Sequence, residues 1–113
     1  MADLVLSGIT ITGGGITVSP PVGQNAIFGY GYNDSGVTAI TNKVSDTGVV
    51  ATDTTGVGTA RQSPAAVGYG GDKGIFGYGQ IAGSTPVSMT NLVSNTGVVA
   101  TDTTGVGTAR SNL

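Results

Sequence analysis

The acidic residues that could do chemistry in this sequence recur at matching places. Asp53 and Asp102 both lie in a TDTTG segment, where a carboxylate could act as an acid group or as a calcium ligand. Calcium sites need several oxygen ligands at close spacing. An Asp in a Thr-rich stretch more often accepts a hydrogen bond from its own backbone in an Asx turn. We therefore interpret both aspartates as turn formers and expect no metal and no cofactor.

Two arginines recur in the same way. Arg61 and Arg110 each end a TGVGTAR segment, and we expect them to cap backbone carbonyls or to pair with an Asp of a neighbouring repeat. General acid–base and nucleophilic catalysis depend mainly on His, Cys, Glu and clustered carboxylates. The chain has no His and no Cys, and its six acidic residues are all Asp and are dispersed. The sequence therefore predicts a protein that is not an enzyme.

Two further segments could contact ligands. The GYGGDKG segment at 68–74 is similar to a phosphate-binding loop, but no helical pattern follows it and such anion sites need a helix N-terminus. We predict a hairpin turn there instead. Tyr32 lies next to Asn33 and Asp34, so that its ring could stack on a sugar.

The charge balance excludes several classes of partner. A net charge of −2 with only four basic residues leaves no basic surface for nucleic acid. No stretch is long and apolar enough to span a membrane, and the N-terminus is acidic where a signal peptide needs basic residues. A mean hydropathy of +0.22 argues against disorder. We therefore expect synthesis in a host cytoplasm without export by the general secretory route.

An internal repeat is the strongest signal in the sequence. The segment TGVVATDTTGVGTAR occurs unchanged at 47–61 and at 96–110, and IFGYG recurs at 27–31 and 75–79. The repeat is therefore about 49 residues long, with a loop of variable sequence between its matched segments. Self-similarity at this period is typical of repeat architectures such as propellers and solenoids.

Short runs of β-branched and aromatic residues, separated by Gly, Asn, Asp and Pro, predict strands in both copies. In the second copy these runs are PAAVGYG, GIFGYGQ, VSMTNLVS and GVVATDT, which predicts an all-β fold with four antiparallel strands per repeat. Because side chains alternate along a strand, Phe76 and Tyr78 should pack on one face, as should Phe28 and Tyr30 at the matching places. Gly77 lies on the flatter opposite face, which a neighbouring repeat could approach closely.

The order of these features resembles the kelch-like β-propeller repeat over roughly residues 25 to 113. Arg61 precedes a strand of small residues and a strand ending in glycines, and after a variable loop two more strands lead to Arg110. The adjacent Gly pair of the family is GYG here, and its Trp is absent. In style the repeat is most similar to the divergent Gly- and Thr-rich propeller repeats of bacteriophage and environmental viral structural proteins. The resemblance implies one four-stranded blade per repeat.

We expect three parts, which are an N-terminal β arm at 1–24, a first blade at 25–62 with an incomplete first hairpin, and a second blade at 63–113. Propellers close with about four to eight blades, so two blades leave two open faces. The chain is therefore expected to assemble with itself, with three chains forming a six-bladed homotrimer. The arm could add strands to another protein or supply the missing strand of the first blade, and both interpretations stay open.

These expectations favour a non-enzymatic virion structural protein. It would be a capsid decoration (cement) protein or an appendage knob, built as a symmetric ring that docks on another virion protein through its arm. This step is an analogy, because a fold does not establish a function. The alternative is a carbohydrate-binding, lectin-like propeller whose variable loops at 32–39 and 80–87 recognise glycans. A third interpretation is a two-blade piece of a longer propeller.

Overall fold

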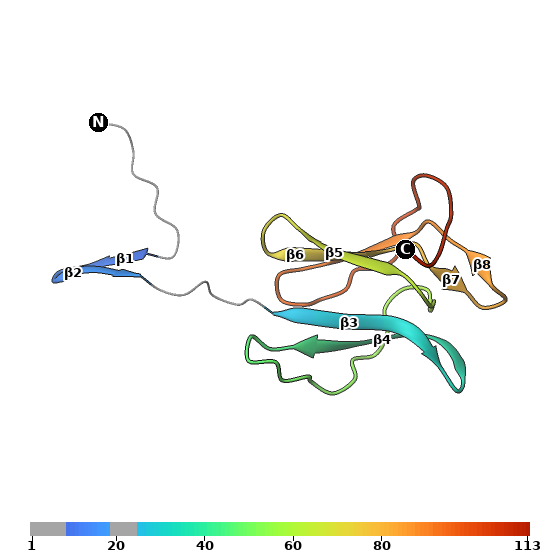
Figure 1. The fold of residues 1–113 in the computed structure, drawn as a ribbon, viewed down its shortest axis with the longest axis horizontal. Helices are drawn as coiled ribbons and strands as arrows, with labels where there is room; N and C mark the ends of the chain where they lie inside the picture. The colour runs from blue at the N-terminus through green and yellow to red at the C-terminus, as the bar shows by residue number, and fades with distance from the viewer. Residues whose placement is uncertain (1–8, 19–24) are drawn as a thin grey trace.

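A computed structural model describes residues 9–18 and 25–113 (Figure 1). Within this part, β-strands are the only regular secondary-structure elements. The strands are β1 (Ile9–Thr12), β2 (Gly15–Val18), β3 (Ala26–Asn33), β4 (Gly36–Val44), β5 (Ala65–Tyr69), β6 (Lys73–Gly77), β7 (Gln80–Ile81), β8 (Thr85–Pro86) and β9 (Thr90–Val93). The described residues include no helix of the length and apolarity needed to cross a membrane.

The strands form four small antiparallel sheets, β1–β2, β3–β4, β5–β6–β9 and β7–β8, so the predicted all-β class is confirmed. We refer to residues 25–62 as repeat 1 and to residues 63–113 as repeat 2. The run GVVATDT, predicted as the fourth strand, joins β9 only through isolated pairs at Val99 and Thr103, and repeat 1 has the same pattern. Between these two pairs, the side chain of Asn91 donates to the backbone carbonyl of Ala100 at 3.1 Å.

The two repeats share the same strand register. In repeat 1, β3 pairs with β4 so that Phe28 lies opposite Asn42. In repeat 2, β6 pairs with β9 so that Phe76 lies opposite Asn91. Because residues that are directly opposite in an antiparallel pair lie on one face of the sheet, each Phe shares a face with an Asn.

A left-handed backbone conformation redirects the chain at each tyrosine, and in repeat 1 this residue lies in a β-bulge. Tyr30 and Tyr78 have left-handed φ angles of 63° and 62°, and the register of β3 and β4 shifts between Gly29 and Gly31. Phe28 is 65% exposed, whereas Tyr30, two residues later, is only 8% exposed. The prediction that the Phe and the Tyr of a repeat share one face is therefore wrong, because the bulge breaks the alternation of the strand.

The hydrophobic core lies between the two repeats. Tyr30 packs edge-on against Phe76, with ring centroids 5.2 Å apart and an interplanar angle of 73°, and Val93 and Val99 complete the buried cluster. Gly29 permits this contact, since a Cβ at that position would lie 2.8 Å from the Phe76 ring. Figure 1 shows the resulting arrangement, in which β3 and β4 lie beside β5 and β6.

The first two strands form a hairpin of their own, with Ile9 opposite Val18 and Thr12 opposite Gly15. Figure 1 shows this hairpin apart from the other strands. Among the described strands β3 pairs with β4 alone, so β1 and β2 do not add a strand to its other edge. The rest of the predicted arm, at 1–8 and 19–24, lies outside the described residues.

Candidate functional site

Each repeat ends with an arginine stacked on a tyrosine. The Cζ atom of Arg61 lies 4.1 Å from the ring centroid of Tyr30, and Arg110 lies at the same distance from Tyr78. In both repeats the arginine Nη1 donates to the carbonyl two residues before it, which is the carbonyl contact expected of these side chains. Burial raises the pKa of Tyr30 above its ordinary value, although the Arg61 cation opposes that shift.

Arg61 also reaches across to repeat 2. Its Nη2 donates to Oδ1 of Asn91 at 2.6 Å, and both side chains are fully buried. Nδ2 of Asn91 donates in turn to Oδ1 of Asp102 at 2.8 Å, which fixes Oδ1 of Asn91 as the acceptor. Nε of Arg61 is buried without a hydrogen-bond partner within the part of the chain that the structure describes. The centre of the contact between the repeats is therefore polar and directional.

Asp102 binds the end of repeat 1. Its carboxylate accepts hydrogen bonds from the backbone N–H of Thr59 at 3.1 Å and from the Thr59 hydroxyl at 2.6 Å. A Cβ at Gly58 would collide with Asp102 and with Asn91, so glycine lets the backbone pass over both side chains. Burial works to raise the pKa of Asp102, but the hydrogen bonds from Thr59 and Asn91 outweigh it and hold that pKa below its ordinary value.

The interpretation of the two aspartates as formers of Asx turns is therefore wrong. Among the hydrogen bonds of the described residues, Asp102 accepts from Thr59 and Asn91 and not from its own backbone two residues on. Asp53 accepts from Nδ2 of Asn42 at 2.8 Å in the same way. The amide of the Asn on the neighbouring strand lies within reach of each carboxylate, and it takes the place of the local backbone donor.

Each repeat thus has two different faces. The acceptor face comprises Phe28, Asn42 and Asp53 in repeat 1 and Phe76, Asn91 and Asp102 in repeat 2. The donor face comprises Gly29, Tyr30, Thr59 and Arg61 in repeat 1 and Gly77, Tyr78, Thr108 and Arg110 in repeat 2. The donor face of repeat 1 and the acceptor face of repeat 2 form the contact described above, which we call the joint. The other two faces have no partner within the described chain, so that Phe28 and Arg110 are exposed where Phe76 and Arg61 are buried.

The three candidate ligand contacts lie together at the end of the β3–β4 hairpin. Tyr32 is 68% exposed, and Oδ1 of Asn33 accepts from the backbone N–H of Ser35 at 2.9 Å, which closes the turn around Asp34. This end of repeat 1 presents one aromatic ring and two short polar side chains. The GYGGDKG segment forms the turn between β5 and β6, as predicted.

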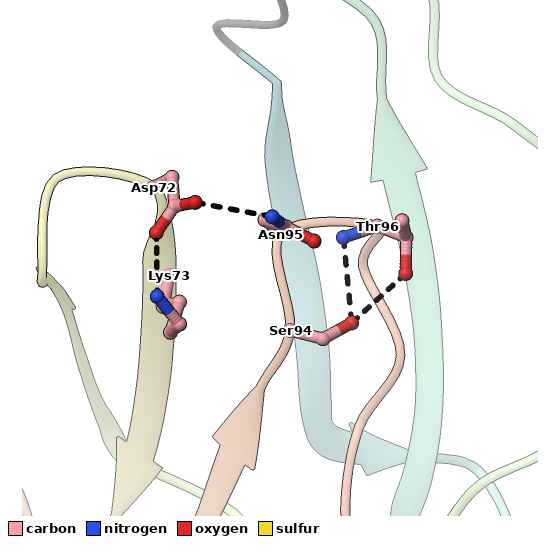
Figure 2. A network of polar contacts seen from close by, with 5 residues as sticks. All are labelled: Asp72, Lys73, Ser94, Asn95 and Thr96. Atoms are coloured by element: carbon pink, nitrogen blue, oxygen red, sulfur yellow. Dashed lines mark hydrogen bonds and ion pairs between the residues drawn. The ribbon is translucent and has the colours of Figure 1, made fainter.

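A groove of about 480 Å³ lies between the first residues of β3 and the β6–β9 part of repeat 2. Figure 2 shows the polar network at its rim, in which Lys73 pairs with Asp72 at 2.8 Å and Asn95 donates to the same carboxylate at 3.1 Å. Ser94 and Thr96 share a hydroxyl contact in the adjacent turn. The hydrogen bonds from Lys73 and Asn95 lower the pKa of Asp72, and Asp72 raises the pKa of Lys73. The ammonium of Lys73 is therefore already matched by a carboxylate.

Sequence reasoning overlooked the asparagines and threonines of the joint. Asn91 is fully buried, and Thr59 provides two of the donors to Asp102. A signal for the asparagines was present, because the dipeptide Thr-Asn occurs at 41–42 and again at 90–91, with the spacing of the long repeat. A polar dipeptide repeated inside a predicted strand indicates a buried hydrogen-bonded position.

The described residues contain no group of three or more acidic side chains that could hold a metal ion. Comparison of the chain with protein-family models, with curated proteins and with solved structures finds no match. The joint and its two uncovered faces are the features from which a function can be argued.

Proposed function

We propose that this protein is a non-enzymatic structural protein that works by assembling with copies of itself. The observation that carries this proposal is the joint, which uses one face of each repeat and leaves a complementary face uncovered on each. One of these faces presents Phe28 at 65% exposure. A large apolar side chain exposed on a face that is otherwise built for packing is typical of a protein interaction surface.

In this proposal each repeat is one blade of a propeller. The strands β5, β6 and β9 lie in chain order in one antiparallel sheet, and the segment with Val99 and Thr103 runs along the outer side of β9. That is the strand order of a blade. The packing of Phe76 over Gly29 fits the face-to-face contact of neighbouring blades. Three chains would then form a six-bladed homotrimer.

We further propose that this ring belongs to a virus particle, as a capsid decoration protein or an appendage knob. Its support is the likeness of the repeat to Gly- and Thr-rich repeats of bacteriophage structural proteins, together with a composition that is low in charge. The β1–β2 hairpin is the segment that we assign to docking on another virion protein, by adding its strands to an exposed sheet edge.

Two measurements test the proposal separately. Light scattering of the purified chain at micromolar concentration should give three times the chain mass, and a monodisperse folded monomer would contradict self-assembly. Quantitative mass spectrometry of purified particles should find the chain at a high and fixed copy number. If the chain assembles but is missing from the particles, the proposal that it belongs to a virus particle is wrong and the proposal of self-assembly stands.

A second candidate function is glycan binding at the β3–β4 hairpin end. The observation that favours it is Tyr32, an aromatic ring that is 68% exposed beside the polar side chains of Asn33 and Asp34. Stacking on a sugar ring would make this end of repeat 1 a receptor-binding site. A glycan array should show binding that Tyr32→Ala abolishes, and an array without any signal would exclude this candidate.

A further inference from the structure

We propose that the uncovered donor face of repeat 2 binds the uncovered acceptor face of repeat 1 in a second copy of the chain. The contact between copies would repeat the joint within the chain, residue for residue. This inference rests on the proposed self-assembly and adds to it the two surfaces, their polarity and their contacts. The occupant of each face is a second copy because the chain itself already contains the matching surface.

The polar contacts of the joint have an unused counterpart on each face. Arg61 binds Asn91 in the joint, and the free equivalents of these residues are Arg110 and Asn42. Arg110 is already stacked on its tyrosine at the distance seen for Arg61. Its side chain therefore adopts, before any contact, the conformation that the joint requires. A preorganised donor loses less side-chain entropy on binding.

The carboxylate contact is prepared in the same way. Asp53 accepts from Asn42 at 2.8 Å, the same distance as that between Asp102 and Asn91. In the joint the remaining acceptor sites of the carboxylate are filled by Thr59. The free donor of the same type is Thr108, which occupies the matching place in the unchanged segment at 96–110.

The apolar part of the joint also has its free counterpart. Phe76 lies over Gly29 and against Tyr30. The matching pair is Phe28 and Gly77. Gly77 is itself buried within repeat 2, and a Cβ built there has only a Thr90 methyl group within 4 Å. Burying Phe28 there would remove a 65% exposed aromatic side chain from water, which favours the contact.

Because the two faces differ, the contact between copies is head to tail and cannot be isologous. A heterologous contact of this kind gives a closed ring when its rotation divides a full turn, and an open filament otherwise. In either assembly, a copy contacts one neighbour through the donor face of its repeat 2 and another through the acceptor face of its repeat 1. This property makes the proposal testable by mixing two variants that are each damaged on one face only.

The test uses Phe28→Asp, which damages the acceptor face, and Arg110→Asp, which damages the donor face. Both side chains are exposed, so both variants are expected to fold, and circular dichroism would check this. Val49→Asp places the same new charge on an apolar residue that is also 65% exposed and lies outside the two faces, because its equivalent Val98 stays 60% exposed beside the joint. In sedimentation velocity over a concentration series, each face variant alone should remain a monomer. The Val49→Asp control should assemble as the wild-type chain does.

An equimolar mixture of Phe28→Asp and Arg110→Asp should form a dimer of twice the chain mass, because each variant retains the face that the other lacks. A mixture without a dimer would overturn the proposal. If both single variants still assembled, the head-to-tail contact would be wrong although self-assembly stood. A wild-type chain that remained monomeric would overturn self-assembly and this contact together.

Discussion

Arg61 of repeat 1 donates a 2.6 Å hydrogen bond to Asn91 of repeat 2, and neither side chain is exposed to solvent. Burial of apolar side chains is non-directional, so it sets the alignment of two sheets only through the fit of their shapes. A buried guanidinium that must find one amide oxygen allows a single alignment, since a buried cation without its partner is costly. The pair therefore sets how the two repeats meet, while Phe76 and its apolar neighbours provide the buried area.

The first prediction compares the two arginines. Arg61→Ala removes the stack on Tyr30 and leaves Asn91 without its donor, so we expect a loss of about 2 to 4 kcal/mol in the free energy of unfolding. Arg110→Ala removes an exposed side chain that is stacked on Tyr78 and should cost only about 0.5 to 1 kcal/mol in the monomer. Urea unfolding followed by circular dichroism measures both at low protein concentration. Equal losses for the two variants would contradict the joint.

The second prediction concerns the glycines under the aromatic contact. A Cβ at position 29 would lie 2.8 Å from the Phe76 ring, so Gly29→Ala should destabilise the monomer by about 1 to 3 kcal/mol through overpacking. Gly77→Ala meets only a Thr90 methyl group at 3.3 Å and should cost clearly less. Thermal unfolding of the two variants under matched conditions provides the comparison. A lower melting temperature for Gly77→Ala than for Gly29→Ala would speak against the packing described.

The third prediction compares two glycines with the same backbone conformation. Gly58 and Gly107 have φ angles of 79° and 86°, so an alanine at either place bears a similar conformational penalty. Only at Gly58 would the new Cβ collide with Asp102 and Asn91. Gly58→Ala should therefore lower the urea midpoint more than Gly107→Ala, and the difference reports the contact across the joint. Equal midpoints would show that the backbone of repeat 1 does not lie on Asp102.

The fourth prediction is a loss of stability in acid. The pKa of Asp102 is held below its ordinary value in the folded chain, so the unfolded chain binds more protons as the pH falls past the unfolded pKa. The stability that Asp102 contributes is therefore complete above its unfolded pKa and is lost as the pH falls through its lower folded pKa. Urea unfolding between pH 7 and strongly acidic pH would reveal this slope.

Two variants identify the source of that slope. The Asp102→Asn variant has a neutral amide in place of this carboxylate. The free energy of unfolding of this variant should therefore depend less on pH in the acidic range. Asp53→Asn changes the matching residue outside the joint and leaves Asp102 in place, so the slope should persist. If the acid dependence survived Asp102→Asn unchanged, then groups other than this carboxylate would be responsible.

The sequence predicted the fold class and the repeat because these depend on local patterns. Turn residues, β-branched runs and the unchanged segment at 47–61 and 96–110 are visible without any knowledge of tertiary contacts. The direction of Tyr30 was not predictable from alternation, because it follows from a left-handed residue in a bulge and that conformation is rare outside glycine. Alternation alone therefore placed the Tyr on the wrong face.

The polar centre of the joint was foreseen only in part. Arg61 stood out because it is one of two arginines in the chain, and a contact with a carbonyl or a neighbouring repeat was expected of it. The partner, Asn91, comes from a strand 30 residues further on, and no rule of local spacing connects the two. The role of Asp102 depends on the same long-range contact, which is why a local Asx turn seemed the better interpretation.

The unchanged segment also provides an internal reference for hydrogen exchange. The intrinsic exchange rate of an amide depends on its neighbours in sequence, and these are identical around Thr59 and Thr108. The amide of Thr59 donates to Asp102 across the joint, whereas Thr108, at the matching place of the same segment, lies on an uncovered face. The ratio of their exchange rates in one monomer therefore measures how often the two repeats separate, without a second protein for comparison.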